Sequence, residues 1–200
     1  MNKYEPVWHT YSRARLLNLP EIVVKGLFAN NSLTDTIMRA CDREFSVAVI
    51  EQKTDRAFLS ESTKLNTCSF AKANVRSVIL RCKTTPVIFA RTVLPLQYMK
   101  RSLLRLAMLG NRSLGSVLYS ERTISKQQAE IAIFNRKHFL FDYIESHCAI
   151  ALQQDVVGRR SIFELGKQKL LLNEIYLPAY WEEVQSTAPP APSLSAPRRR

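Results

Sequence analysis

Long apolar runs are missing from this chain, and their absence excludes proteins that cross a membrane with helices. No run reaches the roughly 18 consecutive apolar residues that a membrane-spanning helix requires. Residues 1–6 also lack the basic and then apolar order of a signal peptide. From these two absences we expect a soluble cytoplasmic protein without stable insertion in a membrane.

Glycine is scarce as well, with five residues among 200, whereas 46% of the residues are hydrophobic. This composition is typical of a packed globular protein and excludes fibrous and disordered classes. A chain of this length fits one domain, which can bury most of its apolar surface without help from metals or disulfides. We expect one domain over residues 1–186 and a disordered tail over 187–200, rich in proline, alanine and arginine.

Cysteine and histidine are few and form no metal or redox motif. The four cysteines are Cys41, Cys68, Cys82 and Cys148, and none lies at CxxC spacing from another. The three histidines form neither HxH nor HExxH, so we predict no metal site. Because an export signal is also missing, we predict that the thiols are reduced and mostly buried.

Positive charge is the one strong excess in the composition, with a formal net charge of +12. Such an excess fits nucleic acid, an anionic membrane surface or a small anionic substrate. The basic residues are spread along the chain, with local clusters such as Lys100–Arg101 and Arg159–Arg160. No helix-turn-helix, RNA-binding motif or interleaved aromatic pattern accompanies them, so we predict no nucleic-acid partner.

Hydrophobic periodicity predicts the elements of the first half of the chain. A helix is expected to begin after Ser32, its N-cap, and a strand is expected over 45–50. Residues 51–70 are polar with scattered apolar positions, which indicates a turn or loop. An antiparallel hairpin follows over 75–94, and helical spacing of apolar residues predicts a helix over 96–109.

The second half of the chain adds further strands. Residues 127–157 contain both an alternating piece at 129–133 and a helix-compatible piece at 139–152. Another hairpin is predicted over 160–177, before Pro178 ends regular pairing. The whole order lacks the regular strand and helix alternation of a parallel sheet. We therefore predict an α+β fold, a single domain in which helices pack on an antiparallel sheet.

Two charged residues stand on the apolar side of predicted strands. Alternation places Arg76 on the same face as Val78, and it places Glu174 on the same face as Leu172. A charge that faces the core is costly unless a partner compensates it. Two interpretations follow: the two residues form a salt bridge with each other, or a ligand presents an anion to Arg76 and a hydroxyl to Glu174.

Four segments carry a resemblance to a known family. They read PVIFARTVLP at 86–95, LGNRSLG at 109–115, GRRS at 158–161 and KLLLNEIYLP at 169–178. Together they resemble the chorismate lyase family, with the order and most spacings kept from about Leu27 to Pro178. The resemblance implies an antiparallel α+β fold and a cofactor-free reaction on the small molecule chorismate. That reaction forms 4-hydroxybenzoate and pyruvate and supplies ubiquinone biosynthesis.

The same resemblance implies roles for residues of this chain. Arg76 would hold the ring carboxylate of the substrate, with backbone amides at Leu114 and near Leu33 completing the anion site. Glu174 would meet the ring hydroxyl, either to orient the ring or to take a proton during the elimination. The family also encloses its aromatic product, so we expect product inhibition by 4-hydroxybenzoate.

Arg91 is a further candidate catalytic residue, on the face of Val87 and Phe89. Our hypothesis is that its guanidinium receives the carboxylate of the departing enolpyruvyl group, because the arginine fork matches a carboxylate. The alternative is that Arg91 forms a structural ion pair.

The chain departs from the family pattern at three places. Ala90 stands where a glycine is expected, Leu33 stands where a methionine is common, and residues 132–157 form a longer connection. A non-catalytic module that senses small acids, similar to the effector-binding domains of transcription regulators, is the main alternative function. A lyase that makes another hydroxybenzoate isomer is a further one. In every case we expect a monomer.

Overall fold

The structure is a computed structural model that describes residues 4–29, 32–69, 71–99, 109–114, 117–118 and 123–184. Most of the helix expected over 96–109 lies outside these ranges, as does the expected tail over 187–200. At the start of the segment expected to be helical, Leu96–Tyr98 forms a short 3₁₀ helix, η2.

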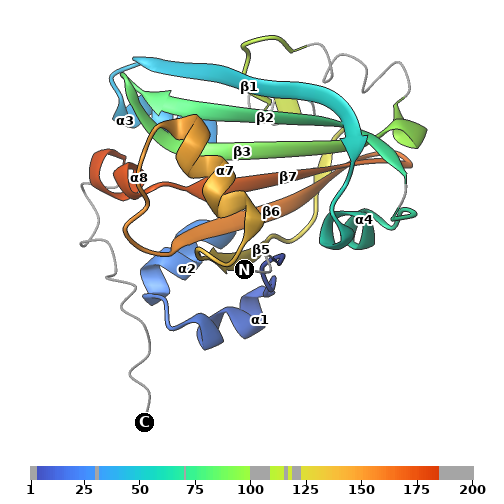
Figure 1. The fold of residues 1–200 in the computed structure, drawn as a ribbon, viewed down its shortest axis with the longest axis horizontal. Helices are drawn as coiled ribbons and strands as arrows, with labels where there is room; N and C mark the ends of the chain where they lie inside the picture. Colours follow the sequence, from blue (N-terminus) through green and yellow to red (C-terminus); the bar gives the residue numbers. More distant parts are fainter. Residues whose placement is uncertain are drawn as a thin grey trace.

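One sheet of seven strands organises the described residues. The strands are β1 (Phe45–Arg56), β2 (Lys72–Cys82), β3 (Thr85–Pro95), β4 (Ser125–Lys126), β5 (Glu130–Phe134), β6 (Val156–Leu165) and β7 (Gln168–Tyr176). Their order is β1-β2-β3-β7-β6-β4, and β5 also pairs with β6 (Figure 1). Every pairing is antiparallel, which confirms both predicted hairpins and the α+β class.

Helices flank the sheet on both sides. They are α1 (Tyr11–Ala14), η1 (Arg15–Leu17), α2 (Glu21–Phe28), α3 (Leu33–Ala40), α4 (Leu59–Leu65), α7 (Phe139–Cys148) and α8 (Pro178–Glu183). The predicted N-cap of α3 is confirmed, because the Ser32 hydroxyl accepts a hydrogen bond from the Asp35 amide at 3.2 Å. The ambiguous region 127–157 contains both expected pieces, β5 and α7.

The loop predicted over 51–70 is wrong for most of its length. Strand β1 continues to Arg56, and α4 follows it. The outer half of β1 is an exposed sheet edge, so its side chains are polar on both faces and alternation cannot reveal the strand. Lys53 instead pairs with Glu51 at 2.8 Å and with Asp55 at 3.2 Å, two neighbours on its own face of the strand.

The two faces of the sheet carry different covers. Residues directly opposite each other in an antiparallel pair lie on the same face. One face presents Val78, Ala90 and Leu172, which pack with buried residues of α2, α3 and α8. The other presents Ile79 and Phe89, which pack with α7. Figure 1 shows α7 crossing the face nearest the viewer, with α3 partly hidden behind the strands. The long connection 132–157 therefore supplies α7, which covers the face of the sheet that presents Ile79 and Phe89.

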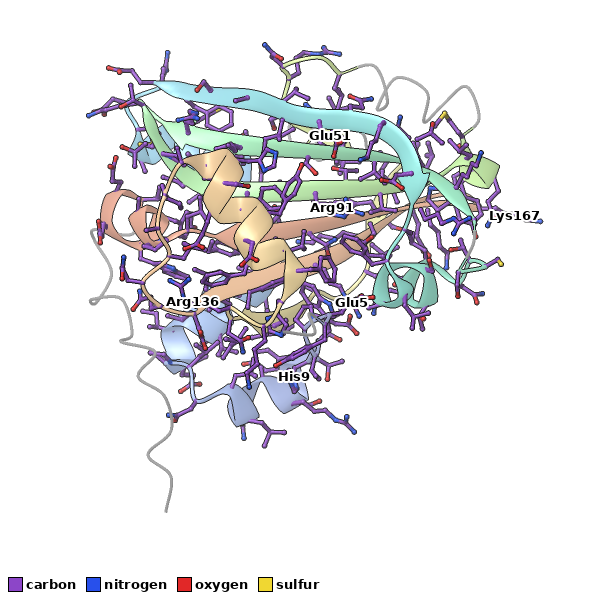
Figure 2. All side chains as sticks on the ribbon, in the orientation of Figure 1. Glu5, His9, Glu51, Arg91, Arg136 and Lys167 are labelled. Carbon is purple, nitrogen blue, oxygen red and sulfur yellow. A yellow bond between two sulfur atoms is a disulfide. The ribbon has the colours of Figure 1, made fainter. Side chains whose placement is uncertain are left out.

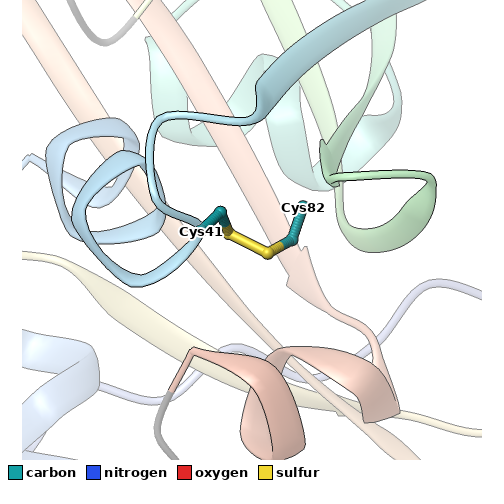
Figure 3. The surroundings of a disulfide bond; sticks show 2 residues. All are labelled: Cys41 and Cys82. Carbon is teal, nitrogen blue, oxygen red and sulfur yellow. A yellow bond between two sulfur atoms is a disulfide. The ribbon is translucent and has the colours of Figure 1, made fainter.

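Cys41 and Cys82 form a disulfide, which corrects the prediction of reduced thiols for this pair (Figure 3). Their Cα atoms are 5.4 Å apart although 41 positions separate them in the chain. Cys82 pairs with Phe45 across β1 and β2, and Cys41 ends α3 just before β1. Sequence spacing does not reveal this contact, because strand register creates it. Cys148 is free and buried, whereas Cys68 is free and exposed.

Candidate functional site

Arg76 lies in the middle of β2 with 3% of its surface exposed. Its Nη2 donates to the carbonyl oxygens of Gly110, at 2.7 Å, and Arg112, at 3.2 Å. Its Nε has no hydrogen-bond partner among the residues that the structure describes, and none of their carboxylates pairs with it. Burial lowers the pKa of the Arg76 guanidinium. A buried cation whose partners in the described residues are neutral carbonyls retains the capacity to bind an anion.

The segment that holds Arg76 also contacts the start of α3. Gly110 has a φ of 55°, a left-handed conformation that favours glycine, and it turns the chain toward Leu114. The hydroxyls of Thr34 and Ser113 are 2.7 Å apart, and both residues are buried. Leu33, in the first turn of α3, and Leu114 are buried as well. The two positions predicted to supply backbone amides therefore lie on segments that touch each other.

Glu174 pairs with Arg159 and not with Arg76, so the first interpretation of the two charges is wrong. Both Nε and Nη2 of Arg159 lie 2.7 Å from Oε2 of Glu174. Arg159 also donates from Nη1 to the Leu27 carbonyl at 3.3 Å. Arg159 and Glu174 are 3% and 7% exposed. In the sequence Arg159 stands out only as part of a basic cluster, and the signal for its buried position is its alternation with apolar Val157.

Arg76 and Glu174 share one face of the sheet. Arg76 lies opposite Thr92 on β3, and Glu174 lies opposite Ala90 on the same strand. The two positions are thus two strands and two residues apart, or about 12 Å between Cα atoms. That separation suits a ligand with polar groups at opposite ends of a ring.

A small cavity adjoins this face. Its volume is about 100 Å³. The residues that line it are Gly26, Leu27, Leu33, Thr36, Arg159, Tyr176, Tyr180 and Trp181. Typical ligand pockets are larger, at about 300–1,000 Å³, so side chains must move for an aromatic ring to enter. A wider hollow of about 610 Å³ lies along α3 between Asp35 and Arg43, but it contains none of the predicted site residues.

Arg91 lies on the opposite face of the sheet, which corrects its predicted place in the site. It faces Ser77 and Asn173 across the neighbouring strands, one residue out of step with Arg76 and Glu174. Its Nε lies 2.9 Å from Oε1 of Glu61, and its Nη2 lies 3.3 Å from Oε2. Figure 2 shows Arg91 on the side that α7 crosses. The alternative, a structural ion pair, describes Arg91.

Arg160 belongs to the same opposite face. Its Nε lies 2.7 Å from Oε2 of Glu130, and its guanidinium carbon lies 4.5 Å from the centre of the Trp8 ring. Glu130 also pairs with Lys64 at 2.9 Å. The two consecutive arginines of β6 thus form ion pairs on opposite faces of the sheet, Arg159 with Glu174 and Arg160 with Glu130.

The fold places the protein in the α+β class, as a single domain in which helices pack on one antiparallel sheet. The chain belongs to the chorismate lyase family, since the family model "Chorismate lyase" matches residues 7–186. Among the helices of the described ranges, none combines the length and apolar character needed to span a lipid bilayer.

Several relatives carry the name "Probable chorismate pyruvate-lyase". The protein of Methylococcus capsulatus is 35% identical over 153 residues, covering 76% of this chain and 93% of the relative. The protein of Pseudomonas fluorescens is 30% identical over 182 residues, covering 90% and 92%. Among solved structures, a GntR-family transcriptional regulator from Bacillus cereus has a similar fold. Its TM-score is 0.50 and its identity 12%, covering 68% of this chain and 93% of that one.

Proposed function

We propose that this chain is a chorismate pyruvate-lyase that converts chorismate to 4-hydroxybenzoate and pyruvate, the first committed step of ubiquinone biosynthesis, in the cytoplasm. One observation carries the proposal. Arg76 is a buried guanidinium with an unpaired Nε among the described residues, and it shares a sheet face with buried Glu174. The names of the relatives at 30–35% identity agree with it.

In this proposal Arg76 binds the carboxylate on the ring of chorismate. The Nε of Arg76, which has no hydrogen-bond partner among the described residues, can donate a charge-assisted hydrogen bond to a carboxylate oxygen, while Nη2 stays bound to the carbonyls of Gly110 and Arg112. Backbone amides at Leu114 and in the first turn of α3 near Leu33 complete the anion site, since amides at a helix start have no partner within the helix. The Thr34 to Ser113 contact fixes these two segments relative to each other.

Glu174 meets the ring hydroxyl. Nε and Nη2 of Arg159 both contact Oε2, and in this proposal Oε1 accepts the hydrogen bond of the ring hydroxyl. Arg159 therefore acts as a positioning residue, because it fixes the orientation of the carboxylate that accepts a hydrogen bond from the ring hydroxyl.

The reaction needs orientation more than a strong catalyst. Loss of the enolpyruvyl group from one ring carbon and of a proton from its neighbour makes the ring aromatic, which drives the elimination. The protein then has to hold the substrate and stabilise charge that develops on the leaving oxygen. Replacement of Glu174 by Gln separates its two possible jobs. A rate loss below about a hundredfold assigns orientation, and a larger loss assigns proton transfer.

Mixing the purified protein with chorismate and identifying the products tests the proposal. Pyruvate and 4-hydroxybenzoate in equal amounts support the lyase. The fold shared with a transcriptional regulator favours a second candidate, a module that binds a small acid without changing it. Unchanged chorismate together with measurable binding would select that second function.

A further inference from the structure

Chorismate carries a second carboxylate, on its enolpyruvyl side chain, and Arg91 lies on the wrong face to receive it. The site face offers other groups near the end of the sheet where β4 pairs with β6. Ser161 follows Arg159 by two positions on β6, so both side chains lie on the site face. Lys126 on β4 lies opposite Phe163, two positions further along, and shares the same face. We call Lys126, Arg159 and Ser161 the β6 edge cluster.

Ser161 gives the first reason to regard this cluster as a site. It is 1% exposed, and its Oγ has no hydrogen-bond partner among the described residues. A buried hydroxyl without a partner is costly, and native structures rarely leave one. A ligand oxygen would supply the partner. By sheet geometry the Cα atoms of Ser161 and Lys126 are about 8 Å apart, within reach of a lysine side chain bridging toward the hydroxyl.

Lys126 gives the second reason. Its ammonium is close enough to Arg159 and Glu174 to interact with both charges. Burial and the positive charge of Arg159 lower the pKa of Lys126 to about 8, while Glu174 opposes that change. The positive charges of Arg159 and Lys126 exceed the single negative charge of Glu174, so this partly buried group keeps a net positive charge that a further anion would compensate.

The position of the cluster relative to Arg76 gives the third reason. Ser161, Leu172, Thr92 and Arg76 form one row across β6, β7, β3 and β2. Arg76 and Ser161 stand at opposite ends of this row, three strand spacings or about 14 Å apart between Cα atoms. Glu174 lies on the β7 strand between them. Arg76 at one end and the β6 edge cluster at the other are therefore far enough apart for one small dianion to lie between them.

We infer that the β6 edge cluster is a second anion subsite, in which Lys126 and Ser161 bind the side-chain carboxylate of a dianionic substrate held at its other end by Arg76. The inference rests on the proposed function. It assigns the enolpyruvyl carboxylate to this edge of the site face and leaves Arg159 to hold Glu174 in position. It also distinguishes substrate from product, since 4-hydroxybenzoate has only the ring carboxylate and makes no use of the cluster.

The test compares chorismate with 4-hydroxybenzoate on the full chain. Replacement of Lys126 by Met should raise the KM for chorismate about 10- to 100-fold, the usual size of a lost charge-assisted contact. The inhibition constant of 4-hydroxybenzoate should stay within about twofold. Lys126→Arg should restore most of the affinity. Ser161→Ala removes a hydroxyl that has no hydrogen-bond partner among the described residues, so it should raise the KM by a smaller factor without loss of stability.

Lys167→Met is the matched control, because it removes the same charge from an exposed position at the tip of the β6–β7 hairpin (Figure 2). Equal losses for both ligands, or no loss for chorismate, would overturn the subsite. Turnover by the unaltered protein tests the proposed function separately. If the protein binds chorismate without turnover, dissociation constants replace KM in the same comparison. If it binds neither ligand, both proposals fail.

Discussion

Arg159 and Glu174 lie directly opposite each other on β6 and β7, and two nitrogens of the guanidinium lie 2.7 Å from one carboxylate oxygen. Both side chains are buried. The pair therefore fixes the carboxylate on the site face and gives each buried charge an opposite charge in direct contact.

Replacement of Arg159 by Met should leave Glu174 buried without a cation at 2.7 Å and lower the free energy of unfolding by about 3–5 kcal/mol. Urea denaturation of the purified variant measures the change. Arg159→Met combined with Glu174→Gln should recover part of the loss, because no uncompensated carboxylate remains. A single variant as stable as the unaltered protein would show that the pair does not stabilise the fold.

Replacement of Arg91 by Met should act on stability and not on substrate binding. Glu61 would keep its hydrogen bonds from Asn173 and from the Phe58 amide but lose its cation, at a cost of about 3 kcal/mol. The KM for chorismate should stay within about twofold at temperatures where the variant is folded. A KM raised tenfold or so with unchanged stability would return Arg91 to the site.

The pH dependence of kcat/KM for chorismate should report Lys126. The cationic form binds the carboxylate, and the pKa of Lys126 is lowered to about 8, so kcat/KM should fall as pH rises through that value. Arg159 and Glu174 are charged groups of the described residues that act on the pKa of Lys126, the first lowering it and the second raising it. Lys126→Arg should flatten this alkaline limb, because arginine stays charged. An unchanged limb in that variant would assign the titration elsewhere.

Product inhibition should depend on Arg76. Because the ring carboxylate is present before and after the reaction, 4-hydroxybenzoate keeps the contact with this guanidinium. Initial rates should fall as 4-hydroxybenzoate is added, and Arg76→Met should weaken this inhibition about tenfold or more. Rates that do not respond to the product in the unaltered protein would contradict the expectation.

Thiol counting should reveal the disulfide. Under native, non-reducing conditions an alkylating reagent should modify Cys68 alone, since Cys148 is buried and burial raises the pKa of its thiol to about 11. Denaturation should add Cys148, and reduction should add Cys41 and Cys82. Loss of a crosslink between residues 41 positions apart should lower stability by about 4 kcal/mol. Four reactive thiols without reductant would exclude the bond.

The sequence predicted which face of a strand a charged residue occupies, but it did not predict which residue forms its ion pair. Alternation correctly placed Arg76 and Glu174 each on an apolar face of its own strand, and turn residues located both hairpins. The partner of Glu174 depends on how β6 aligns with β7, and alternation within one strand carries no such information. Arg91 was assigned to the site although it stands at an odd offset from it, an error that only the register between β2 and β3 exposes.

Other features stayed hidden for related reasons. The outer half of β1 has one face in solvent and the other nearly so, and its polar residues resemble a loop. Lys126 belongs to a strand of two residues, too short for any periodic signal. The Cys41 to Cys82 contact arises when β1 folds back on β2, a long-range event that spacing along the chain does not encode.

The consecutive arginines of β6 help to fix the register of this strand, because each pairs with a carboxylate on a different face of the sheet. If β6 slid by one position, Arg160 would take the place of Arg159 and Glu174 would still meet a guanidinium. Glu130 and the Trp8 indole would then face Ser161 and lose their cation. The loss of these contacts, on the face opposite the site, would destabilise the misaligned sheet. The correct alignment of β6 is therefore favoured without any contribution from a bound ligand.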